Sequence, residues 1–396
     1  MDTRERLDPD LNVVRELREF GGDSFKRCVQ CATCSVVCEL SGGDGDFPRK
    51  KMLYAQWGLK DQLTASLDPW LCYYCGKCSE RCPRGAEPGE TLMSLRRWLT
   101  SRYDFTGLSR LFYRSWKAEV FVILLVAAAT AYGFWTYGSA NGSLEIYDGP
   151  GAFMPSSMVH IFDWVMAGVL TTLLGINAIR MWWFTTGSNK NLKIPLSAYI
   201  KRLPTIPLHF VTQKRFAECD ERPPWVAHLI LMLSYATLFT LIMFFLHSMQ
   251  SGPEINWSVH AFGYAASIGL VGTLIYTIHG RINKTGEYHR YSHDSDWIFL
   301  GMLLIVALTG IVQHLLHRSG AIVEANIAYV IHLSFVVPML TLEVPFGKWS
   351  HMLYRPLAVY LAELQCEALG ARSQAGKPAP TSAETRPKTE PKQAEA

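Results

Sequence analysis

Eight of the ten cysteines stand in two identical runs near the N-terminus, and their spacing suits iron-sulfur chemistry. Both runs read C-x2-C-x2-C-x3-C. In this pattern three closely spaced thiolates bind three irons of one cubane, while the fourth cysteine reaches the other cluster. We therefore predict two [4Fe-4S] clusters with interlocked ligands. The first has the ligands Cys28, Cys31, Cys34 and Cys82, and the second has Cys72, Cys75, Cys78 and Cys38.

The alternative for so many cysteines is a structural zinc site. Zinc usually takes two C-x2-C pairs separated by a longer spacer, and it needs only four ligands. Here four cysteines fall within eleven residues, twice over, which favours cubanes. Cys219 and Cys366 stand apart from both runs and are predicted to be ordinary free thiols.

Histidines at the ends of two apolar segments form a second set of candidate ligands. A haem with two histidine ligands needs imidazoles that face each other from different helices at the same depth. Nineteen residues separate His228 from His247 and His332 from His351, which is about 28 Å of helix. Pairing by depth predicts one inner and one outer haem b. The inner ligands are His228 and His351, and the outer ligands are His332 and His247.

Other polar residues of the apolar segments are also functional candidates, because ionisable groups inside a membrane are costly. His160, His260 and His314 compete with His247 for the outer site. Asp163 follows His160 by three residues and lies on the same helix face. We predict that His160 and Asp163 take up protons from a quinol near the outer haem. The alternative is that they, like histidines at segment ends, are merely interfacial or face a neighbouring helix.

Six apolar segments are long enough to cross a membrane, for which about 20 residues are needed. They run at 119–138, 157–184, 225–248, 256–280, 296–317 and 325–347. Positions nineteen apart fall about 100° off a shared helix face, so the pairing scheme requires helix distortion, which Pro338 and Pro345 would supply in the sixth segment. Loops 185–224 and 280–295 hold seven and three Lys or Arg residues, whereas loops 138–156 and 249–256 hold none. Basic loops stay inside, so both termini are expected in the cytoplasm of a bacterial or archaeal cell.

The segments divide the chain into four regions. Residues 1–100 are predicted to form a cytoplasmic, two-cluster, ferredoxin-like α-helical domain, and 101–118 a basic, aromatic surface linker. Residues 119–360 are predicted to form a six-span transmembrane α-helical haem domain. Residues 361–396 form a tail, expected to be disordered after about residue 372 because it has few apolar side chains.

Composition excludes several other functions. Hydrophobic residues make up 49% of the chain and charged residues 18%, as expected for a chain with a large membrane part. A net charge of +4 gives no reason to expect nucleic-acid binding. There is no G-x-G-x-x-G motif after a strand, so flavin or nicotinamide binding by this chain is not expected. The cytoplasm keeps thiols reduced, which leaves the clustered cysteines free for metal.

Two stretches resemble known families. The sequence WLCYYCGKCSERCPRGAEP, within residues 20–100, resembles the ferredoxin-like C subunit of heterodisulfide reductases. The stretch HLSFVVPMLTLEVPFGKWSHMLYRP, which contains His332 and His351, is similar to the last haem-binding span of the nitrate reductase gamma subunit. His228 fits the inner ligand of that family. The family's outer partner falls at Leu238, where this sequence departs from the pattern.

The union of both halves resembles the membrane subunits of quinone-interacting membrane-bound oxidoreductases. This resemblance implies two [4Fe-4S] clusters, two haems b, and menaquinol as the electron donor. It also implies soluble flavin and iron-sulfur partners like the A subunit of heterodisulfide reductase, with adenylylsulfate reductase of sulfate respiration as the acceptor. One alternative is the membrane electron donor of a heterodisulfide reductase-type complex. Another is a non-catalytic membrane anchor.

Overall fold

The computed structural model describes residues 7–42, 46–149, 151–189, 192, 194–218, 222–250 and 256–368, without the side chains of His247 and Gln250. Within these residues the chain is helical, with no β-strand and one isolated bridge between Ser143 and Ala152. The predicted α-helical fold class is therefore confirmed. The tail predicted to be disordered after about residue 372 lies outside the described residues.

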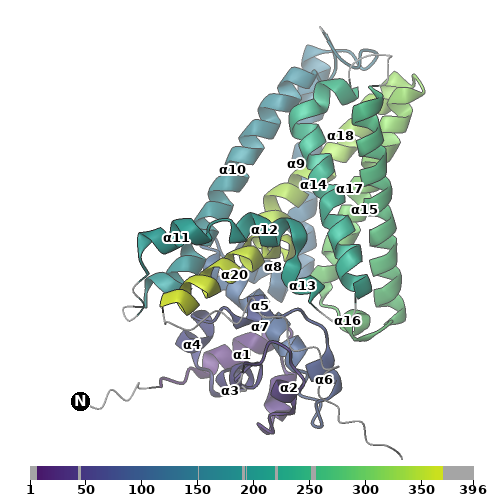
Figure 1. Cartoon of the computed structure of the whole chain (residues 1–396). Helices are drawn as coiled ribbons and strands as arrows, with labels where there is room; N and C mark the ends of the chain where they lie inside the picture. Colours follow the sequence, from purple (N-terminus) through teal and green to yellow (C-terminus); the bar gives the residue numbers. More distant parts are fainter. Residues whose placement is uncertain are drawn as a thin grey trace, which may run out of the picture.

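The N-terminal head is built from short helices that alternate with the cysteine runs (Figure 1). Its core holds fully buried Leu17, Phe25, Met52 and Trp98. The helices of the head are α1 (Leu11–Glu19), η1 (Ser24–Arg27), α2 (Thr33–Val36), α3 (Arg49–Trp57), α4 (Lys60–Thr64), α5 (Asp68–Leu71), α6 (Lys77–Glu80), α7 (Pro88–Tyr103) and α8 (Leu108–Arg114).

Among the described residues, six helices are long and apolar enough to cross a membrane. They comprise α9 (Trp116–Asn141), α10 (Ser156–Trp182) with a π-helical end η2 (Trp183–Gly187), α14 (Arg222–Gln250), α15 (Trp257–Asn283), α17 (Asp294–Arg318) and α18 (Ile322–Pro338) with η3 (Met339–Glu343) and α19 (Val344–Phe346). Their outward faces carry large apolar side chains, such as Phe121 at 67% and Ile268 at 74% exposure. Such surfaces suit lipid rather than water.

Short helices lie between the long helices and the head (Figure 1). They are α11 (Leu196–Arg202), α12 (Thr205–Thr212), α13 (Lys214–Ala217), α16 (Glu287–Arg290), η4 (Lys348–Ser350) and α20 (His351–Ala368). The head packs directly on α20, because the ring of Tyr354 lies 4.9 Å from that of Trp70 and 5.2 Å from that of Tyr103. The buried core of the head continues into α10, α11 and α20, which fixes the cysteine runs against one end of the helix bundle.

The sixth long helix is distorted where the sequence predicts it. Pro338 ends α18, and the π-helical turn Met339–Glu343 separates it from Pro345 in α19. A proline removes a backbone donor and crowds the preceding turn, so the helix widens locally. Gly347 then ends the span in an extended conformation, and η4 and α20 turn away across the bundle end. His351 therefore starts a new helix at the head end of the bundle.

Candidate cofactor sites

The two cysteine runs share a backbone conformation. Gln30 and Tyr74 stand at the same place in each run and have φ of 60° and 62°. Ala32 and Gly76 also correspond, with φ of 69° and 80°, and each precedes a one-turn helix. Left-handed residues that alternate with ordinary ones turn successive N–H groups inward, an arrangement that binds anions and iron-sulfur clusters. The backbone of both runs thus fits a negatively charged cluster.

The thiols are neighbours across the runs in the pattern that the spacing predicts. Burial, together with the nearby thiols of Cys28 and Cys31, raises the pKa of Cys34 to about 11. Burial also raises the pKa of Cys28, with Cys82 among the groups that add to the shift. Metal binding would remove these thiol protons outright.

In the second predicted ligand set, a thiol of the first run also lies near thiols of the second run. Burial is the main cause that raises the pKa of Cys38 to about 12, and the neighbouring Cys72 and Cys75 raise it further. Within the described residues, no three His, Cys, Asp or Glu side chains converge as ligands of a single metal ion. A cubane places each thiolate on a different iron, so its ligands need not converge on one point.

A cavity of about 170 Å³ lies where the head meets the long helices. One water needs about 10–15 Å³, so the space far exceeds a single solvent molecule. Its wall combines head residues near Cys72, such as Tyr73 and Tyr74, with the ends of α14, α15 and α17. Aromatic rings dominate the remaining lining, as in sites for flat apolar ligands. These rings include Trp70, Tyr113, Phe216, Tyr235, Tyr276, Tyr288, Phe299 and Trp349.

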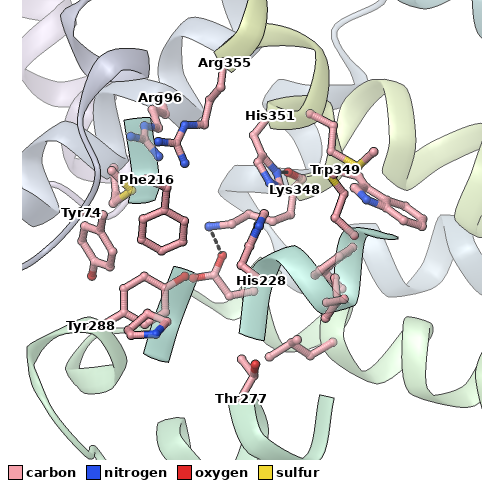
Figure 2. Close-up of a pocket in the computed structure, with 18 of the residues that line it drawn as sticks. Tyr74, Arg96, Phe216, His228, Thr277, Tyr288, Lys348, Trp349, His351 and Arg355 are labelled. Atoms are coloured by element: carbon pink, nitrogen blue, oxygen red, sulfur yellow. Dashed lines mark hydrogen bonds and ion pairs between the residues drawn. The ribbon is translucent and has the colours of Figure 1, made fainter. Parts of the chain in front are cut away.

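His228 and His351 both line this cavity, and their ring centroids lie 6.0 Å apart at an interplanar angle of 60° (Figure 2). Imidazole nitrogens bind metals at about 2 Å. Two nitrogens on opposite sides of one ion are then about 4 Å apart, with the ring centres further out. The observed separation leaves room for such an ion between the rings.

Hydrogen bonds fix which nitrogen of each ring is available. The Nδ1 atom of His351 lies 2.6 Å from the carbonyl oxygen of Lys348, and Nδ1 of His228 lies 2.8 Å from Oε1 of Gln213. Because these oxygens only accept, each Nδ1–H must donate, and the Nε2 lone pair stays free. Ligand histidines usually donate the other ring N–H in this way. The chemistry of this donor set therefore fits a haem iron.

Five cationic side chains and two carboxylates also line the cavity. Some of these cations form ion pairs in the described residues, and others do not. Asp296 pairs with Lys348 at 2.5 Å, shown dashed in Figure 2, and with Arg281 at 3.5 Å. In the described part of the chain, Arg96 and Arg355 form no ion pair. Instead, both donate hydrogen bonds to the carbonyl oxygen of Cys72. The cavity therefore holds unbalanced positive charge beside a cluster ligand.

The far end of the bundle holds the other predicted histidines. Nδ1 of His332 lies 3.0 Å from Oγ1 of Thr309, which donates its own proton to the carbonyl oxygen of Ile305. His332 must therefore donate, and its Nε2 is left free as in the other two rings. A Cβ at Gly310 would lie 3.0 Å from the His332 ring, so this glycine permits the close approach of α17. The predicted partner, His247, has a side chain outside the described residues, and this pairing stays a prediction.

Two of the competing histidines do meet at the far end. The rings of His260 and His314 lie 5.7 Å apart, and His260 is 2% exposed. Nε2 of His260 is buried without a hydrogen-bond partner in the described part of the chain, whereas Nε2 of His314 accepts from or donates to the Tyr264 hydroxyl at 3.0 Å. Leu238, which occupies the family's outer position, packs partly buried among apolar side chains.

His160 and Asp163 lie one turn apart near the start of α10 and interact electrostatically. One carboxylate oxygen of Asp163 is buried with no hydrogen-bond partner in the described residues. Buried polar atoms usually have a partner. The pair is thus placed together as the sequence predicts, and its role stays a prediction.

Comparison with known proteins assigns the head. Residues 24–86 match the family described as the 4Fe-4S dicluster domain. The N-terminal head is a 4Fe-4S dicluster domain. Because this match covers both cysteine runs, the predicted two-cluster chemistry is confirmed at the level of the domain.

Relatives of the head belong to heterodisulfide reductases. The chain is 31% identical over 107 residues to a protein of Archaeoglobus profundus that is named as similar to the C subunit of heterodisulfide reductase, covering 27% of this chain and 57% of the relative. It is 37% identical over 93 residues to the second iron-sulfur C subunit of the CoB–CoM heterodisulfide reductase of Methanocaldococcus jannaschii, covering 22% and 50%. The chain thus spans about half the length of these curated relatives. No solved structure matches it.

Sequence reasoning missed several residues that line the cavity or hold its histidines. Gln213 lies in a loop between short helices, and Arg96 lies on α7 of the head, 24 residues after Cys72. Arg355 directly follows the buried Tyr354 in α20. The only signal in the sequence was the group of basic and aromatic residues at the edges of the apolar segments, which is also expected for any membrane surface.

Proposed function

We propose that the chain is a membrane electron-transfer subunit that oxidises menaquinol and delivers the electrons to soluble flavoprotein partners. Haem b in the bundle and [4Fe-4S] clusters in the head would supply one-electron redox chemistry. The observation that carries this proposal is the His228–His351 pair, with both Nδ1 atoms fixed and both rings facing a cavity whose opposite wall belongs to the cluster-binding loop.

In the head, the chain's own residues would hold the clusters at a fixed separation. We assign one cluster to the first set, Cys28, Cys31, Cys34 and Cys82, and the other to the second set, Cys72, Cys75, Cys78 and Cys38. The two sets adjoin, because Cys34 is among the thiols whose charge acts on Cys78. Interlocked sets make the domain rigid, which suits repeated electron transfer without rearrangement.

At the far end, we propose a second haem b with His332 as one ligand. His247 is the second ligand that depth pairing favours, and the His260–His314 contact offers the competing pair. His160 and Asp163 would accept the protons that quinol oxidation releases, because their unpartnered carboxylate faces the same end of the bundle. Asp163 would hold such a proton, and His160 would pass it outward.

The orientation follows from charge. Both described ends of the chain, in α1 and α20, lie at the head end of the bundle (Figure 1). The basic loops lie there as well, so we propose that the head faces the cytoplasm of a bacterial or archaeal cell and the far end faces outside. Soluble partners resembling the flavin-bearing A subunit of heterodisulfide reductase would then reach the clusters directly, with adenylylsulfate reductase as the proposed acceptor.

A second candidate function is favoured by the relatives of the head. Their names describe C subunits of heterodisulfide reductases. The chain would then be the membrane electron donor of a disulfide-reducing complex. The two functions differ in the soluble partner, so co-purified proteins from the native membrane would separate them.

The test uses the purified full-length chain in detergent. We expect about eight cluster irons and matching acid-labile sulfide, two haems b by the pyridine haemochrome assay, and haem reduction by a menaquinol analogue. His351→Ala and His228→Ala should each lose one haem. His279→Ala, at an exposed position of α15 outside the cavity lining, is the control and should lose none. A preparation without a Soret band, or haem that quinol cannot reduce, would refute the proposal.

A further inference from the structure

Two arginines at the edge of the cavity have no carboxylate to balance them within the described residues. Arg96 comes from α7 in the head and Arg355 from α20 beyond the last span, and their side chains lie next to each other in Figure 2. A guanidinium remains protonated in proteins, so both side chains carry a positive charge. Two like charges held together are costly unless anions lie close to them. The anionic cluster proposed at Cys72 would offset part of this cost, and the cavity that both arginines line has room for a further anion. Such an arrangement is expected where an anion binds.

The arginines are also fixed in place. Nε of Arg96 donates to the carbonyl oxygen of Pro69 at 2.5 Å, and Nη2 donates to that of Cys72. Nη2 of Arg355 donates to the same Cys72 oxygen at 3.3 Å. These bonds use one edge of each guanidinium. An arginine has five N–H donors in a rigid fork, so donors remain for a carboxylate approaching from the cavity.

The other cations of the cavity are already engaged. Asp296 pairs with both Lys348 and Arg281, and Nε of Arg97 donates to the carbonyl oxygen of Phe20 at 2.7 Å. Glu90, the other carboxylate of the lining, accepts a hydrogen bond from the hydroxyl of Tyr74. Arg96 and Arg355 differ from these cations because they lie side by side, with no carboxylate paired to either within the described residues.

We propose that Arg96 and Arg355 form a carboxylate clamp for the propionate groups of the haem held by His228 and His351. This proposal rests on the function proposed above. A haem carries two carboxylates on one edge, which matches two adjacent guanidinium groups at one side of the histidine pair. The clamp joins the head to the membrane part, because one arginine comes from each. It also bonds the backbone of Cys72, so one pair of side chains contacts both the cluster loop and the haem site.

The electrostatic consequence has a definite sign. A guanidinium close to the haem disfavours the ferric state, which carries one more positive charge than the ferrous state. Removing it should lower the midpoint potential. We expect Arg96→Gln to shift the ferrous–ferric balance about tenfold, which is about 59 mV for one electron. Arg96→Lys should shift it less, because the charge remains while the fork is lost.

The decisive experiment compares two porphyrins in the full-length chain. The apo-protein is reconstituted with haem or with haem dimethyl ester, whose propionates carry no charge, and midpoint potentials are measured by optical redox titration. With haem, Arg96→Gln and Arg355→Gln should each lower the potential. With the dimethyl ester, wild type should have a higher potential, because ferric haem loses the negative propionates that stabilise it. The substitutions should lower the affinity for haem about tenfold and leave the affinity for the ester unchanged, because only haem offers carboxylates to the clamp. Arg102→Gln, on the same helix but outside the cavity lining, is the matched control.

The outcomes separate the clamp from the proposed function. An unchanged potential in both glutamine variants with haem would overturn the clamp. An equal loss of affinity for haem and for the dimethyl ester would also overturn it, because the arginines would then act on something other than the propionates, such as a lipid phosphate. If Arg96→Gln does not fold, Arg355→Gln carries the same comparison. Failure of wild type to bind haem would overturn the proposed function, and the clamp with it.

Discussion

The side-chain oxygen of Gln213 and the Nδ1 atom of His228 lie 2.8 Å apart, which ties a loop residue to a histidine of the long helix α14. Gln213 has φ of 50° and joins α12 to α13. Its amide nitrogen donates to the sulfur of Met232 at 3.2 Å, which leaves the oxygen facing the histidine. The loop therefore sets both the orientation and the tautomer of the His228 ring.

Gln213→Asn tests this relationship. Asparagine tolerates the left-handed conformation, but its shorter side chain should not reach the ring. We expect haem affinity at this site to fall about 10- to 100-fold, as for other outer contacts of metal ligands. Titration of the apo-protein with haem measures it. Gln365→Asn, whose amide bonds Thr185 and Thr186 instead, is the control. Equal affinity in both variants would show that the contact does not hold His228.

The crossed cluster ligands give a second prediction. Cys82→Ser should impair the cluster bound by the first run, and Cys38→Ser the cluster bound by the second run. Each variant should therefore lose the EPR signal of the cluster that is bound mainly by the other run, together with up to about four irons. Cys366→Ser, a free thiol in α20, should keep both. If Cys82→Ser alters the cluster of its own run instead, the crossed assignment is wrong.

Most of the fold could be predicted from the spacing of cysteines and the lengths of the apolar segments in the sequence. The two cysteine runs define the head because ligand geometry depends on neighbouring residues in the chain. The six long helices follow the predicted apolar segments within a few residues, since only length and hydropathy decide whether a helix crosses a membrane. The predicted distortion near Pro338 also appears, as the π-helical turn Met339–Glu343.

The cavity could not be predicted in the same way. Arg96 and His228 are 132 positions apart and meet only because the head packs on α20. Gln213 reaches His228 through a loop whose path no periodicity encodes. The end of α1 at Glu19 likewise depends on local backbone geometry, because Gly21 adopts φ of 86° and its N–H bonds the carbonyl oxygen of Arg18.

A buried carboxyl pair in the bundle gives a third prediction. Glu119 of α9 and Glu343 of η3 are both 0% exposed and lie within hydrogen-bonding reach of each other. In the described residues none of their carboxylate oxygens makes a hydrogen bond of good geometry, although the backbone N–H of Lys348 lies near Glu343. Two such carboxylates cannot both be charged at acceptable cost, so they must share a proton. Glu119→Gln supplies a permanent donor to Glu343 and should leave stability unchanged or raise it by about 1–3 kcal/mol.

Thermal unfolding in detergent measures this effect. Glu145→Gln, on an exposed far-end loop, makes the same chemical change and should be neutral. Gly347→Ala provides an opposite check, because a Cβ there would lie 2.2 Å from Oε2 of Glu343 and should destabilise the pair. A loss of several kcal/mol in Glu119→Gln would contradict the shared proton.

The pH dependence of stability gives the last prediction. His293 precedes α17 and forms its N-terminal cap, with Nδ1 accepting from the N–H of Ser295 at 3.3 Å. Burial, and then the charge of Arg97, lower the pKa of His293 to about 3; Asp296 opposes the shift, and Lys348 adds to it. The unfolded histidine titrates near about 6.5. Below that pH the unfolded chain binds a proton that the folded chain does not, so stability falls as pH decreases.

The slope is about 1.4 kcal/mol per pH unit between the two pKa values. This group alone should therefore cost about 2 kcal/mol between pH 7 and pH 5. His293→Asn keeps a good capping side chain and removes the proton-binding site, so the variant should lose less stability on acidification than wild type. Thermal unfolding in detergent at both pH values measures the difference. His279→Asn, at an exposed position of α15, should follow wild type. Identical pH profiles for wild type and His293→Asn would show that protonation of this histidine does not set the pH dependence of stability.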